Sequence, residues 1–153
     1  MTDVHSPAIR SKNMRAIRSR NTKPELVVRR ELHSAGFRYR LNSPKLPGRP
    51  DLVLAKYRAV IFVHGCFWHG HDCKFFRLPS TRTDFWSSKI EGNRLRDAAN
   101  IQKLNDLGWN VVVVWECLIK APAPIATAGL EKVAAHIREL KRAPAPGVAT
   151  FRC

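Results

Sequence analysis

Four side chains that commonly bind metal ions are spaced as a zinc site would require. Cys66, His71 and Cys73 lie within eight residues of HGCFWHGHDC, and Cys117 ends an apolar run, VVVVWEC. Structural Zn²⁺ takes four Cys or His ligands, and thiolates favour it over Mg²⁺. The alternative, buried free cysteines, fits a polar loop poorly. The pattern therefore predicts a structural zinc site, with no open position at which water could be activated.

A second group of residues could support hydrolysis of a phosphodiester. Asp51 begins one apolar segment, and Val63-His64 ends the next. If the two segments pair as strands, the Asp51 carboxylate and a backbone carbonyl meet, and such oxygens suit Mg²⁺. His69, with an ordinary pKa of about 6.5, could take a proton from water at neutral pH. The alternatives are a turn aspartate and an ordinary loop histidine.

Two aromatic pairs accompany these residues. Phe67-Trp68 lies inside the cysteine-rich loop, and Phe85-Trp86 lies at the start of the next expected helix. Aromatic side chains can enter DNA and unstack a base step, at a cost of roughly a few kcal/mol, and a mismatched base is easier to unstack. The alternative is that both pairs belong to the hydrophobic core.

The composition favours a polyanionic partner. The chain has 153 residues, suited to one domain, and 44% of them are hydrophobic, enough for a core. The net charge is +15, of which +9 falls within residues 1–50. Nucleic acid is the expected partner of such a chain; the alternative is a basic protein kept soluble by its charge.

Membrane and secreted classes do not fit the sequence. No apolar run approaches the roughly 18–20 residues that span a bilayer, and the first residues, MTDVHSPAIRSKNMRAIRSR, contain no apolar core of a signal peptide. We therefore expect a cytoplasmic, reducing location and no membrane partner. In such a location cysteines are metal ligands or free thiols, and Cys153 is expected to be a free thiol.

The elements that must position these residues predict an α/β fold with a central mixed β-sheet flanked by helices. Thr22 and Glu25 match a capping box, which predicts a helix that ends near Gly36. The other expected elements are strands over 37–41, 51–54, 59–63 and 109–115 and helices over 84–106 and 127–140, with proline-rich linkers at 121–124 and 143–147. We expect a basic N-terminal arm (1–22), a catalytic domain (23–142) and a proline-rich C-terminal tail (143–153).

Several of these segments together resemble the very short patch repair (Vsr) endonuclease family. They are SKNMRAIRSR, LPGRPD, VIFVHGCFWHGHDC, TRTDFW, KIEGN, Arg96-Asp97 and LGWNVVVVWEC. The resemblance covers residues 5 to about 118 and is weak beyond Cys117.

The resemblance implies a restriction-endonuclease-like fold and a Mg²⁺-dependent enzyme. Such an enzyme nicks double-stranded DNA 5′ of the T in a T:G mismatch, which arises when 5-methylcytosine deaminates, and so starts very short patch repair. A nick in one strand needs only a monomer. Mismatch-repair proteins are candidate partners.

The resemblance also implies roles for the catalytic residues. Asp51 and the backbone carbonyl of Val63, where the family often has Thr, would bind Mg²⁺. His69 would be the general base, with His64 in support. Glu25 would lie near the water shell of the metal, in competition with its capping role.

Further roles follow from the same resemblance. The zinc ligands would be Cys66, His71, Cys73 and Cys117. The side chains that contact DNA would be Phe67, Trp68 and Trp86 from the major groove, Met14 from the minor groove, and Lys89 and Asn93 as base-reading contacts.

One departure from other restriction-like nucleases is expected to matter. These enzymes commonly carry Glu-x-Lys on the strand after the aspartate, whereas this chain has Phe62-Val63-His64. Two other functions remain open: a non-catalytic zinc-containing DNA-binding module, and a nuclease that cuts both strands of a matched site.

Overall fold

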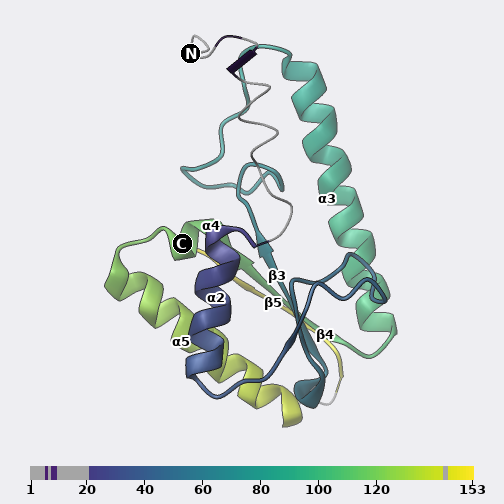
Figure 1. Cartoon of the computed structure of the whole chain (residues 1–153). Helices are drawn as coiled ribbons and strands as arrows, with labels where there is room; N and C mark the ends of the chain where they lie inside the picture. Colours follow the sequence, from purple (N-terminus) through teal and green to yellow (C-terminus); the bar gives the residue numbers. More distant parts are fainter. Residues whose placement is uncertain (1–5, 7, 10–20, 143–144) are drawn as a thin grey trace.

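Five strands form one mixed sheet in the computed structural model, which describes residues 6, 8–9, 21–142 and 145–153 (Figure 1). Their order is β1-β2-β3-β4-β5; β1, β2 and β3 pair antiparallel, and β3, β4 and β5 pair parallel. The bounds are β1 Arg40–Leu41, β2 Leu52–Leu54, β3 Ala59–His64, β4 Asn110–Trp115 and β5 Val148–Phe151. The predicted α/β fold with a central mixed sheet is confirmed.

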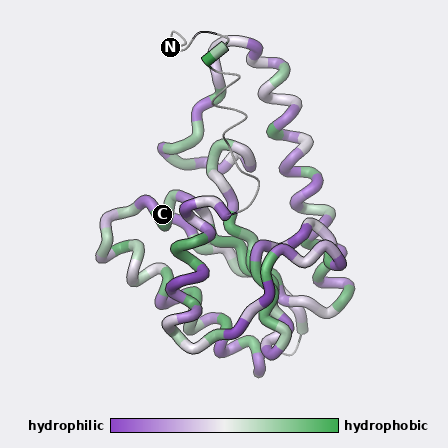
Figure 2. The backbone as a smooth tube through the Cα atoms, in the orientation of Figure 1, coloured by the Kyte–Doolittle hydropathy of each residue, from purple (hydrophilic) through white to green (hydrophobic). Residues whose placement is uncertain are grey.

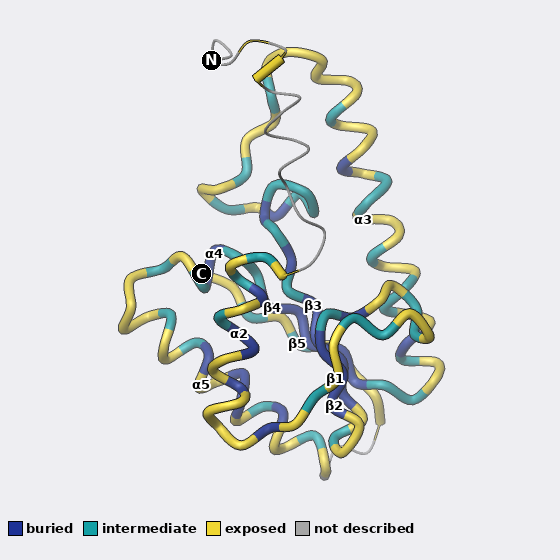
Figure 3. Tube along the Cα trace, in the orientation of Figure 1, coloured by how far each residue is buried: buried dark blue, intermediate teal, exposed yellow. Residues whose placement is uncertain are grey.

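Helices bury both faces of this sheet. One face packs against α2 (Lys23–Ser34), α4 (Glu116–Ile119) and α5 (Ala123–Glu139), and the other packs against the end of α3 (Thr83–Asp106) through Leu104. Along β4, Val112 and Val114 face the first group, while Val111 and Val113 face α3. Burial on both faces explains why this strand is an unbroken apolar run in the sequence. Figure 3 shows β4 as buried, and Figure 2 shows that the strands at the centre of the sheet are hydrophobic.

The start of α2 confirms the predicted cap. The hydroxyl of Thr22 accepts the backbone N–H of Glu25 at 3.4 Å, and Pro24 lies in the first turn. The Glu25 carboxylate reaches back to the N–H of Asn21 at 2.9 Å rather than to that of Thr22. These bonds satisfy backbone N–H groups that a helix start leaves without partners.

The strand expected over 37–41 is shorter than predicted. Phe37 packs in the core and its N–H bonds to the carbonyl of Leu32, so it closes α2 instead of pairing with a strand. Only Arg40–Leu41 pairs with β2, at the edge of the sheet. The alternation in the sequence therefore marked one buried aromatic residue and a short edge strand.

The proline-rich segments also differ from expectation. Pro122 caps α5, which begins at Ala123 rather than near Thr127, because proline is tolerated at a helix start. The C-terminal tail contains β5, which lies beside β4. The N–H of Val111 donates to the carbonyl of Gly147, so pairing starts right after the prolines. The sequence analysis did not predict this strand, because it is only four residues long and follows a proline-rich segment.

Helix α3 extends well beyond the sheet (Figure 1), and the loop that follows β3 lies along the part of this helix from Trp86 to Asp97. Among the described residues, no helix has the length and apolar character needed to cross a membrane.

Candidate active site and metal cluster

Strand pairing places Asp51 next to the end of β3. Leu52 is the register partner of Ile61, so the preceding residue, Asp51, lies near Phe62 and Val63. The Asp51 carboxylate accepts the backbone N–H of Val63 at 2.7 Å. The structure therefore places Asp51 beside the end of β3, as the sequence predicted, and the direct contact is with the N–H of Val63 rather than with its carbonyl.

Burial changes the acidity of Asp51. The pKa of this carboxyl is raised to about 7, mainly by burial and to a smaller extent by nearby Glu25. The Val63 N–H and Arg29 act in the opposite direction. Glu25 is itself buried and forms an ion pair with Arg29 at 3.0 Å. A carboxylate whose charge is poorly compensated, beside a second carboxylate, suits a hard cation such as Mg²⁺.

Two histidines and an aspartate lie beside Asp51 in the same cleft. The rings of His64 and His69 stack with centroids 3.8 Å apart and planes 3° apart. His69 Nδ1 pairs with the Asp97 carboxylate. Burial, together with the neighbouring His69, lowers the pKa of His64 to about 3, so its ring is neutral at physiological pH. The pairing of His69 with Asp97 fixes the orientation of the His69 ring and leaves Nε2 as the ring nitrogen that Asp97 does not contact.

Asp97 was given no role by the sequence reasoning, although it belongs to one of the segments that carry the family resemblance. Its spacing offered a signal: Asn93, Asp97 and Ile101 recur every four residues on α3 and so share one face. Asn93 donates a hydrogen bond to the carbonyl of Trp68, the Asp97 carboxylate pairs with His69, and Ile101 lines the cleft. The polar pair Asn93 and Asp97, four residues apart, therefore indicates the face of α3 that contacts the loop after β3.

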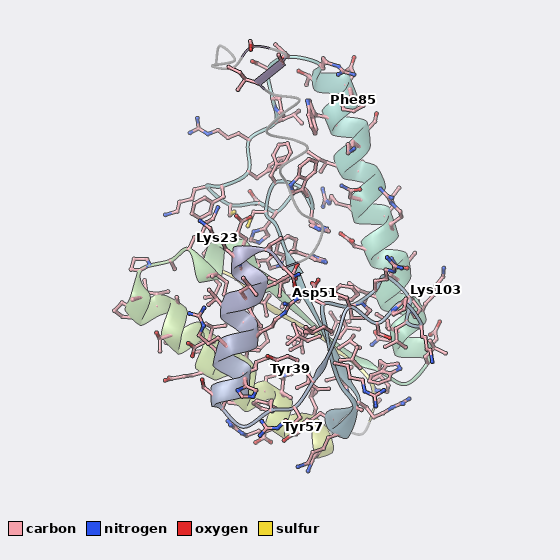
Figure 4. The ribbon with its side chains drawn as sticks, viewed as in Figure 1. Lys23, Tyr39, Asp51, Tyr57, Phe85 and Lys103 are labelled. Carbon is pink, nitrogen blue, oxygen red and sulfur yellow. The ribbon has the colours of Figure 1, made fainter. Side chains whose placement is uncertain are left out.

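These groups line one cleft of about 930 Å³. In Figure 4 Asp51 lies between α2 and α3. The catalytic candidates that line the cleft come from α2, the residue before β2, the end of β3, the following loop and α3; they are Glu25, Asp51, Val63, His64, His69 and Asp97. The structure thus gathers every predicted catalytic residue at one site.

The four predicted zinc ligands also come together. The thiols of Cys66, Cys73 and Cys117 and a ring nitrogen of His71 lie within 4.8 Å of one another. His71 Nδ1 is 3.7 Å from Cys117 Sγ, close to the roughly 3.5 Å expected between S and N ligands of one tetrahedral Zn²⁺.

The electrostatics of this cluster fit a cation. Burial raises the pKa of Cys66, and it raises that of Cys117 to about 11. The cluster is a suitable zinc site, because Zn²⁺ would stabilise thiolates that burial otherwise disfavours.

Two neighbours of the cluster were not indicated by the sequence. The backbone N–H of Cys153 donates to Cys117 Sγ at 3.2 Å, so β5 brings this last cysteine beside the cluster. The Glu116 carboxylate accepts the N–H of Cys66 at 3.2 Å and also lines the cleft. Glu116 therefore connects the two sites.

The aromatic residues form one partly exposed group. The ring centroids of Phe67 and Trp68 lie 5.1 Å apart, and Trp86 is 5.5 Å from Phe67 and 5.9 Å from Trp68. None of the three is buried, and neighbouring Phe85 is 45% exposed. Their exposure does not fit the alternative in which they belong to the core. Trp68 also lines the cleft.

The remaining DNA-contact candidates differ in their surroundings. Asn93 Nδ2 donates to the carbonyl of Trp68 at 2.9 Å, which occupies part of a side chain expected to read bases. Lys89 is exposed, with its amine 5.9 Å from the Phe85 ring. Met14 lies outside the described residues.

Comparison with known proteins gives a consistent result. Residues 2–75 match a family described as DNA mismatch endonuclease Vsr. The chain is 51% identical over 120 residues to the DNA mismatch endonuclease Vsr of Escherichia coli K12, covering 78% of this chain and 77% of that protein.

Two type II nicking enzymes are similarly close. V.XorIIP of Xanthomonas oryzae is 53% identical over 117 residues, covering 76% of this chain and 86% of that enzyme. V.NmeAIP of Neisseria meningitidis is 45% identical over 143 residues, covering 94% and 99%. The last match extends through most of the C-terminal region, where the motif resemblance was weak.

Proposed function

Because the chain belongs to the Vsr DNA mismatch endonuclease family and is a DNA nicking endonuclease, we propose that it nicks duplex DNA 5′ of the T in a T:G mismatch and so starts very short patch repair. Relatives described as type II nicking enzymes share the family, so the mismatch preference needs its own support. The observation that carries it is Trp68, which belongs to the partly exposed aromatic group and lines the catalytic cleft.

The aromatic group gives mismatch recognition a physical basis. Phe67, Trp68 and Trp86 would enter the major-groove side and unstack the base step, and Met14 would act from the minor groove. Unstacking costs roughly a few kcal/mol per step and less at a mispaired base. Since Trp68 and His69 are adjacent in the chain, opening of the step would be coupled to the position of the scissile phosphate.

The residues of the cleft divide the work of hydrolysis. The Asp51 carboxylate and the Val63 carbonyl would hold Mg²⁺, which supplies positive charge to offset the phosphate as negative charge develops. His69 Nε2 takes the proton of the attacking water. Asp97 accepts the Nδ1–H and so keeps the lone pair on Nε2. His64 stacks on His69 and limits its rotation, and Glu25 would bind water near the metal.

The cysteine-rich loop has a structural role in this proposal. Cys66, His71, Cys73 and Cys117 would fill all four positions of Zn²⁺, which leaves none for substrate water. His69 and Trp68 lie between the first two ligands in the chain. Zinc would therefore hold the base and the aromatic residues in place without taking part in the chemistry.

The wider DNA contact rests on charge. The net charge of +15 attracts a phosphate backbone, and Lys89 and Asn93 on α3 are the proposed base-reading contacts. One strand is cut by one cleft, so a monomer suffices. Mismatch-repair proteins remain candidate partners.

The test is a duplex that carries one T:G pair, with each strand labelled differently, beside an otherwise identical T:A duplex. With Mg²⁺ we expect a single nick 5′ of the mismatched T and no cut in the opposite strand. Equal nicking of the T:A duplex contradicts the mismatch preference. Cleavage of both strands favours a matched-site nuclease, and salt-sensitive binding without cleavage favours a DNA-binding module.

A further inference from the structure

A second set of metal-binding side chains exists apart from the cysteine cluster. His64, His69 and Asp97 each offer a ligand atom, and these atoms lie within 4.8 Å of one another. Two imidazoles and one carboxylate are ligands that Zn²⁺, Co²⁺ and Ni²⁺ bind well, whereas Mg²⁺ prefers oxygen ligands and keeps its water. The set is therefore selective for a class of ion other than the one proposed for Asp51 and Val63.

The three groups are held in place by separate elements. His64 is the last residue of β3 and is 6% exposed, His69 lies in the following loop, and Asp97 projects from α3. The stacked rings and the pairing of His69 with Asp97 restrict the rotation of these side chains, and an ion that bound both His69 and Asp97 would replace the hydrogen bond between them. Ordering flexible ligands costs conformational entropy, and this arrangement reduces that cost.

The cleft gives an ion access to this set. The side chains of His69 and Asp97 are each 24% exposed, and all three residues line the cleft. Three protein ligands leave positions for water, as in zinc sites that are not closed.

We propose that His64, His69 and Asp97 form a second transition-metal site, and that an ion bound there inhibits the enzyme by withdrawing His69 from its role as base. If the ion binds Nδ1 of His69, the proton of the neutral ring must reside on Nε2, which can then only donate. If the ion binds Nε2, it occupies the lone pair directly. The inhibition rests on the proposed function, whereas the binding does not.

Metal binding can be measured without any nicking assay. Protein loaded with one equivalent of Zn²⁺ is titrated with Co²⁺ in Mg²⁺-free buffer, followed by calorimetry and visible absorbance. We expect the wild type to take up a second equivalent. His64→Ala and Asp97→Asn should bind it at least about ten-fold more weakly, since each lacks one ligand. Asp97→Asn keeps the size of the side chain, and retention of the first zinc equivalent reports that each variant is folded.

Two matched controls locate the second ion. Asp51→Asn and Cys153→Ser remove potential ligands near the two proposed sites but none of the three groups, so both should keep the second equivalent. The binding proposal is overturned if the wild type takes up only the first equivalent, or if binding is lost in Asp51→Asn or Cys153→Ser while Asp97→Asn retains it.

Nicking of the T:G duplex at saturating Mg²⁺ then tests the inhibition. We expect activity to fall as the second equivalent of Co²⁺ binds and to return when a mild chelator removes it. Full activity with the site occupied overturns the inhibitory half alone. No nicking in the absence of Co²⁺ overturns the proposed function and leaves the metal-binding result standing.

Discussion

The catalytic cleft and the Cys/His cluster meet at the end of β3, yet the chain positions their residues differently. Asp51 and Val63 are fixed by strand pairing and by a direct 2.7 Å hydrogen bond. Cys66, His71 and Cys73 lie in a loop without helix or strand, held locally by short-range bonds such as His71 N–H to the Cys66 carbonyl at 2.9 Å. The sheet can form the first arrangement without a metal, whereas the second gathers three soft ligands that need one.

The difference divides the proposed catalytic residues into two groups. Asp51 belongs to the part that the sheet positions, whereas His69 lies inside the loop, between Cys66 and His71. Loss of Mg²⁺ should therefore stop the chemistry and leave the fold intact. Loss of Zn²⁺ should displace the base and the adjacent Trp68 while much of the sheet persists.

The largest effect is expected for Asp51→Ala. Removing the carboxylate removes the main proposed Mg²⁺ ligand, so nicking of a T:G duplex should fall by at least about 10³-fold. Binding of that duplex and zinc content should be unchanged, because neither the aromatic group nor the cysteine cluster is altered. Single-turnover nicking and a binding titration check this, and full retention of activity would contradict the assignment of the active site.

Cys73→Ser tests the other region. The variant loses one of four proposed zinc ligands, so folded yield and bound zinc should fall together, and nicking should fall with them. Measurements are zinc content by metal analysis, tryptophan fluorescence, and nicking per folded molecule. Cys153→Ser is the matched control, because Cys153 is exposed, is not one of the four proposed ligands, and keeps in this variant the backbone N–H that donates to Cys117 Sγ. Zinc-free protein that remains folded and active would remove the structural role of zinc.

Asp97→Asn is expected to have an intermediate effect. Asparagine can donate as well as accept, so it no longer enforces a proton on His69 Nδ1, and the fraction of rings with a free Nε2 falls. A correctly placed general base contributes about 10²–10⁴-fold, so we expect a loss on the order of 10²-fold in the nicking step. Glu91→Gln, an exposed change on the same helix, should leave the rate unchanged. An equal loss in both variants would show a general effect on α3.

Local patterns were enough to predict the parts of the molecule that depend on nearby residues. The Thr22 cap, the apolar strands and the short turn that brings Asp51 to Val63 all involve residues close in sequence. The zinc ligands were identified because Cys66, His71 and Cys73 are close in the chain and chemically distinctive.

The contacts that were missed join distant segments. Asp97 meets His69 across 28 residues, and Cys153 meets Cys117 across 36. Strand β5 is four residues long and follows prolines, so its own pattern was too weak to reveal a partner in β4. Such contacts are set by tertiary packing, which local propensity does not encode.

The smallest expected effect concerns stability and sharpens the same comparison. Burial raises the pKa of Asp51 to about 7, so the charged form of this carboxyl destabilises the fold when the cleft holds no metal ion. Because the pKa of Asp51 is higher in the folded state than in the unfolded state, its contribution lowers the stability as the pH rises from about 4 to about 7. Above about pH 7 this contribution stays nearly constant. Asp51→Asn removes that charge and keeps an oxygen to accept the Val63 N–H.

In Mg²⁺-free buffer with zinc retained, Asp51→Asn should therefore be more stable than wild type by about 1–2 kcal/mol at pH 8, less than the full shift implies because water reaches the cleft. The difference should shrink toward zero near pH 4, and adding Mg²⁺ at pH 8 should stabilise the wild type and not the variant. Urea unfolding at several pH values measures this. A variant that is less stable than wild type at pH 8 would mean that the sheet needs the Asp51 charge, and the cleft would then resemble the cysteine cluster in depending on its ion.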